Sequence, residues 1–191
     1  GSEYVGDYFK CREYISGFTG SAGTLVVTLD EAGLWTDGRY FLQAAKQLEG
    51  SGIMLRKERQ PGVPAIEEYL KQTLKKGETL GFDGRCIMQD SAEKLITQLN
   101  AQGVAVRTDI DLTGAVWKNR PELSAQPVWP LPVEYAGESS ESKIKRVREF
   151  LVEKKADYFL LTSLEDIAWL LNMRGNDIES TPVISSYLLL G

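Results

Sequence analysis

The chain has 191 residues, of which 42% are hydrophobic and 26% are charged, a balance that excludes wholesale disorder. The net charge of −5 argues against a general nucleic-acid binder, because neutralising phosphates needs a surplus of basic residues. No apolar run approaches the ~20 residues of a membrane-spanning helix. The absence of histidine excludes a Ser-His-Asp triad, a Cys-His pair and histidine-containing metal sites from this chain acting alone.

Hydrophobic periodicity and turn residues predict alternating strands and helices in the first two thirds of the chain. The predicted strands are 24–29, 34–36, 53–55, 79–82 and 104–106, and the predicted helices are 39–49, 64–76 and 91–102. We expect the helix caps and turns to involve Asp37 or Gly38, Pro64, Gly77, Asp90 or Ser91, and Gly103. Trp35 and Trp117 lie in apolar stretches and are predicted to be core or near-core residues of the first domain. The order of elements predicts an α/β fold with a mixed sheet flanked by helices.

Residues 120–140 contain four of the seven prolines and are predicted to be an extended interdomain connector. Beyond them we expect an amphipathic helix over 143–155, with Ile144, Val147, Phe150 and Leu151 on its apolar face and basic residues opposite. The elements predicted after this helix are, in order, a buried strand over 157–162, a helix that opens with a capping box from Ser163 to Asp166, a polar loop over 172–180 and a strand over 181–190.

These elements predict a first domain over 1–119, the connector over 120–140, and a truncated opening part of a second domain over 141–191. The last part buries too little apolar surface to stand as a domain. A weak internal repeat between 14–21 and 169–176 implies that the first domain lacks its opening helix and strand.

Three segments carry a specific resemblance to a known family. They are REYISGFTGSAGTLVVTLDEAGLWTDGRYFLQAA over 12–45, LTGAVWKNRPE over 112–122 and SLEDIAWLLNMRGNDIESTPVISSYLLL over 163–190. Together they closely resemble the N-terminal part of the Xaa-Pro aminopeptidase (aminopeptidase P) family, of the three-domain kind, and nearly the whole chain is covered.

The resemblance implies a creatinase-like N-terminal domain, a second domain of the same fold, and a catalytic domain with a dinuclear metal site, usually of manganese. It implies peptides with proline in the second position as substrates of the intact enzyme, a homodimer, and the missing C-terminal catalytic domain as a partner. The chain ends before the metal ligands, so we expect it to hold no cofactor or metal, to be inactive alone, and to bind neither nucleic acid nor membrane.

We expect a cytoplasmic location, which the two cysteines fit. Cys11 and Cys86 match no C-x-x-C pattern, which fits a reducing compartment where thiols persist, although a single disulfide between them is the alternative.

The glycines and polar residues near the N-terminus have both functional and structural interpretations. Gly17, Gly20 and Gly23 resemble a phosphate cradle, but the motif does not follow a strand and open a helix, so a tight loop is favoured. For Asp37, Arg39 and Tyr40 we expect structural roles: a helix cap, an ion pair with a carboxylate, and a packed ring with a bonded hydroxyl.

Two further patterns are weighed in the same way. Asp109 and Asp111 form a pair that metals can use, but the sequence supplies no third ligand, which favours a solvated turn. The basic residues of helix 143–155 are one pattern that nucleic-acid or membrane binding uses, but the nearby acidic residues favour a solvent-exposed helix face.

Arg174 is the strongest functional candidate. An arginine in a glycine-flanked loop is suited to pairing with a carboxylate, either in a substrate cleft or interdomain contact, or locally with Asp177. The function hypothesis is the non-catalytic N-terminal portion of a metallo-aminopeptidase, serving interdomain packing, substrate access and dimerisation. The alternative is a stand-alone binding or assembly module that reuses the same fold.

Overall fold

The computed structural model describes residues 4–191 and divides them into two compact units. One unit is Lys10–Arg120, and the other joins residues 4–9 to Pro121–Gly191. Residues 1–3 of the predicted first domain lie outside the described residues. Within residues 4–191, no helix combines the length and the apolar character that crossing a membrane requires.

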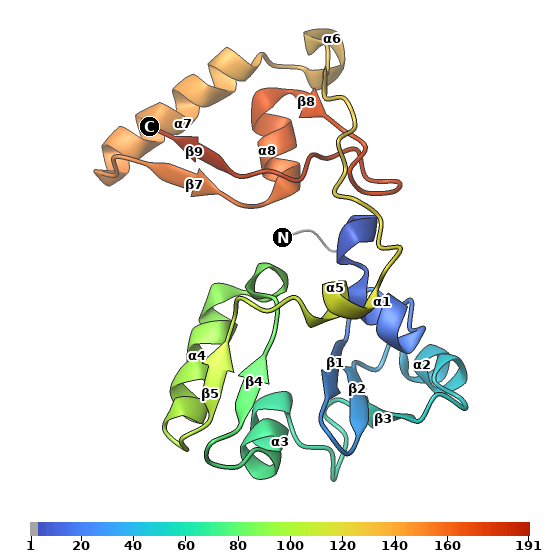
Figure 1. Cartoon of the computed structure of the whole chain (residues 1–191). Coiled ribbons are helices and arrows are strands. Elements are labelled where there is room, and N and C mark those ends of the chain that lie inside the picture. The colour runs from blue at the N-terminus through green and yellow to red at the C-terminus, as the bar shows by residue number, and fades with distance from the viewer. Residues whose placement is uncertain (1–3) are drawn as a thin grey trace. The chain divides into compact units, whose positions relative to one another are not determined.

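The unit Lys10–Arg120 contains a three-stranded sheet (Figure 1). Strand β1 (Thr24–Val27) pairs antiparallel with β2 (Ala32–Thr36), which confirms the predicted hairpin, and β2 pairs parallel with β3 (Ile53–Lys57). Helices α1 (Cys11–Ser16) and α2 (Phe41–Gln47) belong to the same region. Its small core is formed by Phe18, Leu34, Ala44 and Leu48.

A second, two-stranded sheet completes this unit, so the predicted strands form two sheets and not one. Strand β4 (Thr79–Gly81) pairs parallel with β5 (Ala105–Arg107). The helices of this part are α3 (Ile66–Thr73), α4 (Gln89–Asn100) and α5 (Leu112–Val116). The largest core of the unit is formed by Trp35, Tyr69, Leu70, Leu95, Leu99 and Val104. Trp35 of β2 therefore packs with residues of the second part, as its predicted core position requires.

Several predicted helix ends are wrong by a few residues. Helix α2 has Tyr40 at its N-cap and not Asp37 or Gly38, because the Asp37 carboxylate is occupied by Arg39. Helix α4 begins at Gln89, ahead of the expected cap at Asp90 or Ser91, and α3 ends at Thr73, well before Gly77. Gly103 has the left-handed φ of 76° expected just after a helix.

Trp117, predicted to be a core or near-core residue, is half-buried. Its ring stacks on that of Tyr14 with centroids 4.3 Å apart.

The second unit contains the two-stranded antiparallel sheet of β7 (Phe159–Leu161) and β9 (Leu188–Leu190), next to helices α7 (Ser140–Lys154) and α8 (Leu164–Leu171) (Figure 1). Its core is formed by Leu161, Ile167, Leu170 and Leu190, with Ile144 and Val147 of α7 packed against it. The segment predicted as an extended connector carries regular structure, namely β6 (Trp129–Pro130) and helix α6 (Val133–Ala136).

The structure corrects five predictions in this unit. Phe150 was predicted to be buried and is 55% exposed, whereas Lys143, predicted for the basic solvated face, is 2% exposed. The strand predicted over 157–162 is buried only at Leu161. The predicted polar loop contains β8 (Met173–Arg174), which pairs with β6, and the last strand spans only β9. The expected cap at Ser163 is confirmed, because its hydroxyl accepts from the Asp166 N–H.

Candidate functional site

The glycine-rich loop that follows α1 is held by an arginine. Arg12 Nη1 donates to the Gly23 carbonyl at 2.7 Å, and Arg12 Nη2 donates to the Gly20 carbonyl. Gly17 has a φ of 71° and ends α1, which explains the glycine there. A side chain at Gly20 would overlap the Phe18 ring, and one at Gly23 would lie 3.0 Å from the Trp35 carbonyl oxygen. The glycine at 17 is therefore explained by its backbone conformation and those at 20 and 23 by close packing, without a ligand.

Asp37 and Arg39 form a bidentate ion pair directly after β2. Asp37 Oδ1 accepts from the Arg39 N–H at 3.0 Å and from Arg39 Nε at 2.9 Å, and Oδ2 accepts from Nη2 at 2.8 Å. These hydrogen bonds, first from the side chain and then from the backbone of Arg39, lower the pKa of Asp37 to about 2. The Tyr40 hydroxyl lies 2.7 Å from Ser21 Oγ, and its ring packs edge-on against Phe18.

The Asp37 carboxyl is expected to titrate near pH 2, and Arg39→Ala is expected to return its pKa towards the ordinary value of about 3.9. Because the folded-state pKa is depressed, this contact favours the folded state above the ordinary pKa and loses its effect as the pH falls through about 2. NMR titration of the carboxyl carbons measures both values. Asp83 serves as the internal control, and an Asp37 pKa that does not respond to Arg39→Ala would contradict the assignment.

A second Asp–Arg pair of the same kind, Asp83 with Arg85, follows β4 and was not predicted from the sequence. Asp83 Oδ1 accepts from the Arg85 N–H at 3.0 Å and from Arg85 Nε at 2.9 Å. The repeated tripeptide Asp-Gly-Arg at 37–39 and 83–85 is the signal that identifies it. Arg85 also reaches Asp111 at 3.2 Å, and Asp111 pairs with Arg120 at 2.5 Å.

Asp109 and Asp111, considered in the sequence as a pair that metals can use, form ion pairs with arginines. Asp109 pairs with Arg107 at 2.9 Å, while Asp111 pairs with Arg85 and Arg120. Across residues 4–191, no three His, Cys, Asp or Glu side chains gather closely enough to hold a metal ion. The donor set of the described residues therefore does not fit a metal centre.

The two cysteines lie in different chemical environments. Cys11 Sγ is 3.1 Å from Arg120 Nη2. Burial and the nearby Asp83 raise the pKa of Cys86 to about 11, so its thiol is protonated at neutral pH and is a poor nucleophile.

Arg174 lies on β8, directly opposite Trp129 of β6. Its Nη1 donates to the carbonyls of Ala168 at 2.8 Å and Met173 at 2.9 Å, which ties it to the last turn of α8. The expected ion pair with Asp177 is absent from the described residues, because Asp177 Oδ2 instead accepts from the Ser185 N–H at 2.7 Å. Within the same residues, Arg174 Nε and Nη2 have no hydrogen-bond partner, so one edge of the guanidinium is available to a carboxylate.

Lys143 is a further polar residue whose role the sequence did not predict. Its Nζ donates to the Trp169 carbonyl at 2.9 Å and to Asn172 Oδ1 at 2.7 Å, and lies 4.5 Å from the centroid of the Trp169 ring. Asn172 ends α8 in the left-handed conformation. The buried ammonium thus satisfies carbonyl groups at the C-terminal end of α8, where a positive charge is favoured.

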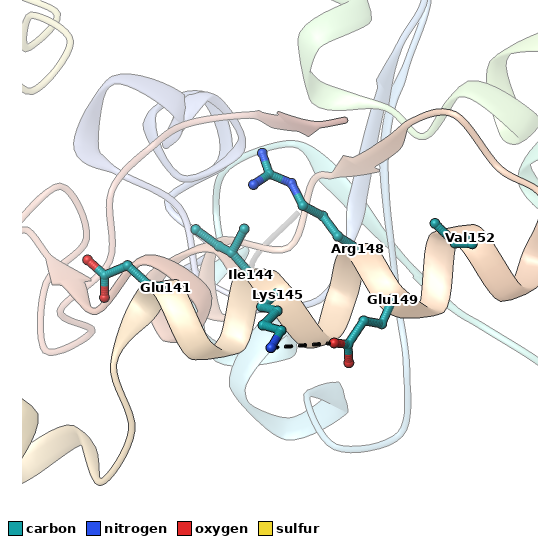
Figure 2. A pocket seen from close by; sticks show the side chains of 6 residues that line it. All are labelled: Glu141, Ile144, Lys145, Arg148, Glu149 and Val152. Atoms are coloured by element: carbon teal, nitrogen blue, oxygen red, sulfur yellow. Dashed lines mark ion pairs between the residues drawn. The ribbon is translucent and has the colours of Figure 1, made fainter.

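An open hollow of about 440 Å³ lies along α7. Figure 2 shows its lining side chains, among them Lys145 and Glu149, whose charged groups are 3.9 Å apart. Arg148 donates to the Gly191 carbonyl at 2.9 Å. No residue singled out as a candidate site lines this hollow, and its alternating charges suit a solvated helix face.

Comparisons with known proteins agree along the whole chain. Two family models, both described as creatinase/prolidase N-terminal domain, match residues 10–121 and 119–191. Xaa-Pro aminopeptidase app-1 of Caenorhabditis elegans is 40% identical over 99% of this chain, and aminopeptidase P2 of Arabidopsis thaliana is 39% identical over the same share. The chain spans only 31% and 27% of the lengths of these relatives.

A solved structure is similar over the same extent. The X-prolyl aminopeptidase of Caenorhabditis elegans, described as a cytosolic enzyme with a di-nuclear active site, superimposes with a TM-score of 0.91 at 39% identity. The match covers 100% of this chain and 31% of that enzyme.

Proposed function

Since this chain belongs to the creatinase/prolidase N-terminal domain family, we propose that it is the non-catalytic N-terminal portion of a Xaa-Pro aminopeptidase. The observation that carries the proposal is the likeness over the full chain to aminopeptidases of which it spans less than a third. The intact enzyme would remove an N-terminal residue that precedes proline. In it, this portion would serve interdomain packing, control of substrate access and dimerisation, in the cytoplasm.

The catalytic chemistry would lie in a region outside this sequence. The related enzyme is described as having a di-nuclear active site, whereas the carboxylates weighed here as ligands are paired with arginines. The two metal ions, which we expect to be manganese, would then be held by the missing catalytic domain. This chain would contribute walls and contacts to the cleft and no metal ligand.

The proposal is tested by comparing this chain with a longer chain from the same gene. We expect no hydrolysis of an Xaa-Pro-Xaa peptide by the 191-residue chain with Mn²⁺, and sustained hydrolysis by the longer chain. Turnover by the short chain that survives repurification would contradict a non-catalytic role. A downstream reading frame without Asp, Glu and His metal ligands would favour a stand-alone binding module.

Within this proposal, Arg174 offers its free guanidinium edge to a carboxylate of the substrate or of the catalytic domain, with Asp177 holding the adjacent segment through Ser185. Arg174→Ala in the longer enzyme is expected to lower kcat/KM about tenfold or more, because a charge-assisted hydrogen bond contributes about 1.5–3 kcal/mol. In the 191-residue chain, losing the bonds to Ala168 and Met173 is expected to cost only about 1 kcal/mol of stability.

Peptidase kinetics and thermal unfolding of the two proteins measure these effects separately. Arg146→Ala is a matched control, since Arg146 pairs with Glu138 on the exposed surface at 2.6 Å. Wild-type kinetics in Arg174→Ala would remove the proposed role in the cleft.

A further inference from the structure

Two side chains of the ribbon formed by β6 and β8 lie next to each other on one of its faces. Trp129 and Arg174 are cross-strand partners in the antiparallel register, with Pro130 opposite Met173. Directly opposed residues of an antiparallel pair project from the same face, with their Cβ atoms about 4.5–5.5 Å apart. Trp129 is 39% exposed. A solvent-accessible indole therefore stands beside the guanidinium that the proposed function assigns to a carboxylate.

Hydrogen bonds at the end of α8 hold this ribbon in place. The N–H of Leu131, directly after β6, donates at 2.7 Å to the carbonyl of Asn172, directly before β8. The buried Lys143 fixes the Asn172 side chain, because its Nζ donates to Oδ1 at 2.7 Å. Arg174 Nη1 itself donates to the Ala168 carbonyl at 2.8 Å. A pair of side chains that is fixed before binding loses less conformational entropy when a ligand arrives.

The segment that follows Arg174 is also constrained. A side chain at Gly175 would lie 2.9 Å from Ile184 Cγ1 and 3.1 Å from the Val183 carbonyl oxygen, so the two segments pack closely here. The Asp177 N–H donates to the same Val183 carbonyl at 3.4 Å. This packing limits the directions in which Arg174 can leave the ribbon.

The two side chains suit the two parts of a single amino-acid residue. A guanidinium binds a carboxylate through two parallel N–H···O bonds. In the C-terminal residue of a peptide, the carboxylate and the side chain are attached to the same carbon atom, so a carboxylate on Arg174 brings that side chain to Trp129. The indole offers a large uncharged face that packs well with apolar and aromatic groups. An acidic side chain would lose hydration against this face without gaining a partner.

We propose that Trp129 is a specificity-determining residue of the aminopeptidase, and that Trp129 and Arg174 together bind the C-terminal residue of a short peptide. The preferred substrates would be Xaa-Pro-Xaa tripeptides that end in an aromatic or large apolar residue. The inference rests on the proposed function, which it deepens by naming a class of substrate and a second contact to it.

The experiment measures kcat/KM of the longer chain from the same gene, with Mn²⁺, for Ala-Pro-Phe, Ala-Pro-Gly and the C-terminal amide of Ala-Pro-Phe. We expect the wild type to prefer Ala-Pro-Phe over Ala-Pro-Gly about tenfold, which corresponds to about 1.4 kcal/mol. The difference is expected mainly in KM, because the contact is the same in the ground state and the transition state. The amide is expected to lose most of this advantage, since Arg174 recognises the free carboxylate.

Two variants of Trp129 separate the ring from the fold. Trp129→Ala is expected to bring the ratio of the kcat/KM values for Ala-Pro-Phe and Ala-Pro-Gly close to one, whereas Trp129→Phe keeps an aromatic face and most of the preference. The matched control is Tyr158→Ala, which removes another exposed aromatic ring of the same unit, 68% exposed, and is expected to keep the ratio. Far-UV circular dichroism checks that the variants fold.

The possible failures can be told apart. Hydrolysis by the wild type without a preference for Ala-Pro-Phe would overturn this inference and leave the proposed function intact. The same holds if Trp129→Ala keeps the preference, or if it lowers kcat/KM equally for both peptides, as a merely structural residue would. A longer chain that hydrolyses none of the peptides would overturn the proposed function and this inference with it.

Discussion

Trp35→Ala is expected to cost about 3–5 kcal/mol of the free energy of unfolding, the range for removing a large core aromatic. Trp35 is 1% exposed and belongs to the largest core of its unit. Its ring lies 4.9 Å from that of Tyr69, and its Nε1 donates to the Pro64 carbonyl at 2.9 Å. The substitution leaves a cavity and an unsatisfied carbonyl together.

Urea unfolding followed by circular dichroism measures the loss, and peptide-resolved hydrogen exchange locates it within residues 10–120. Trp35→Phe is the matched control, because it keeps an aromatic ring and removes only the hydrogen bond and part of the volume, for a loss of about 1–2 kcal/mol. An unchanged urea midpoint in Trp35→Ala would show that this ring is not a core element.

Lys143→Met is expected to destabilise the second unit by about 2–3 kcal/mol, although it replaces a charged side chain with an apolar one of similar length. The variant leaves the Trp169 carbonyl and Asn172 Oδ1 without the Lys143 donor. It also removes a positive charge from the C-terminal end of α8. Asn172 in turn donates to the Glu138 carbonyl at 2.8 Å, and its own carbonyl accepts from Leu131 at 2.7 Å, so the loss extends beyond one helix end.

Hydrogen exchange within residues 121–191 and thermal unfolding measure this effect. Lys145→Met is the control on the same helix, since the Lys145 side chain is 79% exposed and its ion pair with Glu149 is long at 3.9 Å. We expect the control to change stability by less than about 0.5 kcal/mol. Equal stability of the two variants would mean that the buried ammonium contributes nothing.

Local patterns predicted much of the fold because they report local physics. The apolar run that begins at Thr24 and the turn around Asp30 to Gly33 specify a hairpin through side-chain alternation and loop geometry, and β1 and β2 form it. Ser163 caps α8 because its hydroxyl needs only the N–H three residues ahead. The motifs over 12–45 and 163–190 identified the family, which the matches along the whole chain confirm.

The same patterns fail where a side chain chooses between a local and a distant partner. Asp37 has the residue type of a helix cap, yet Arg39 binds both of its oxygens and α2 begins later. For Arg174, a local ion pair with Asp177 was one of two interpretations, the other being a contact in a substrate cleft or between domains. The structure instead gives Arg174 the Ala168 carbonyl of α8 as a partner, while Asp177 accepts from the Ser185 N–H.

Periodicity and turn residues were thus sufficient for the α/β class and for the order of the strands and helices between residues 24 and 107, since these depend on neighbours within a few turns of the chain. The quoted motifs were sufficient for the family. These patterns did not predict the burial of a side chain where that burial depends on contacts with residues far away in the sequence. Lys143 is buried because Trp169 and Asn172, 26 and 29 residues away, surround its ammonium with acceptors. Leu160 is exposed because β9 pairs along its edge and the core packs on the other face of its strand. Hydrophobicity alone assigns these two residues the opposite environments, and only the packing of α7, α8 and the β7–β9 sheet reverses the assignment.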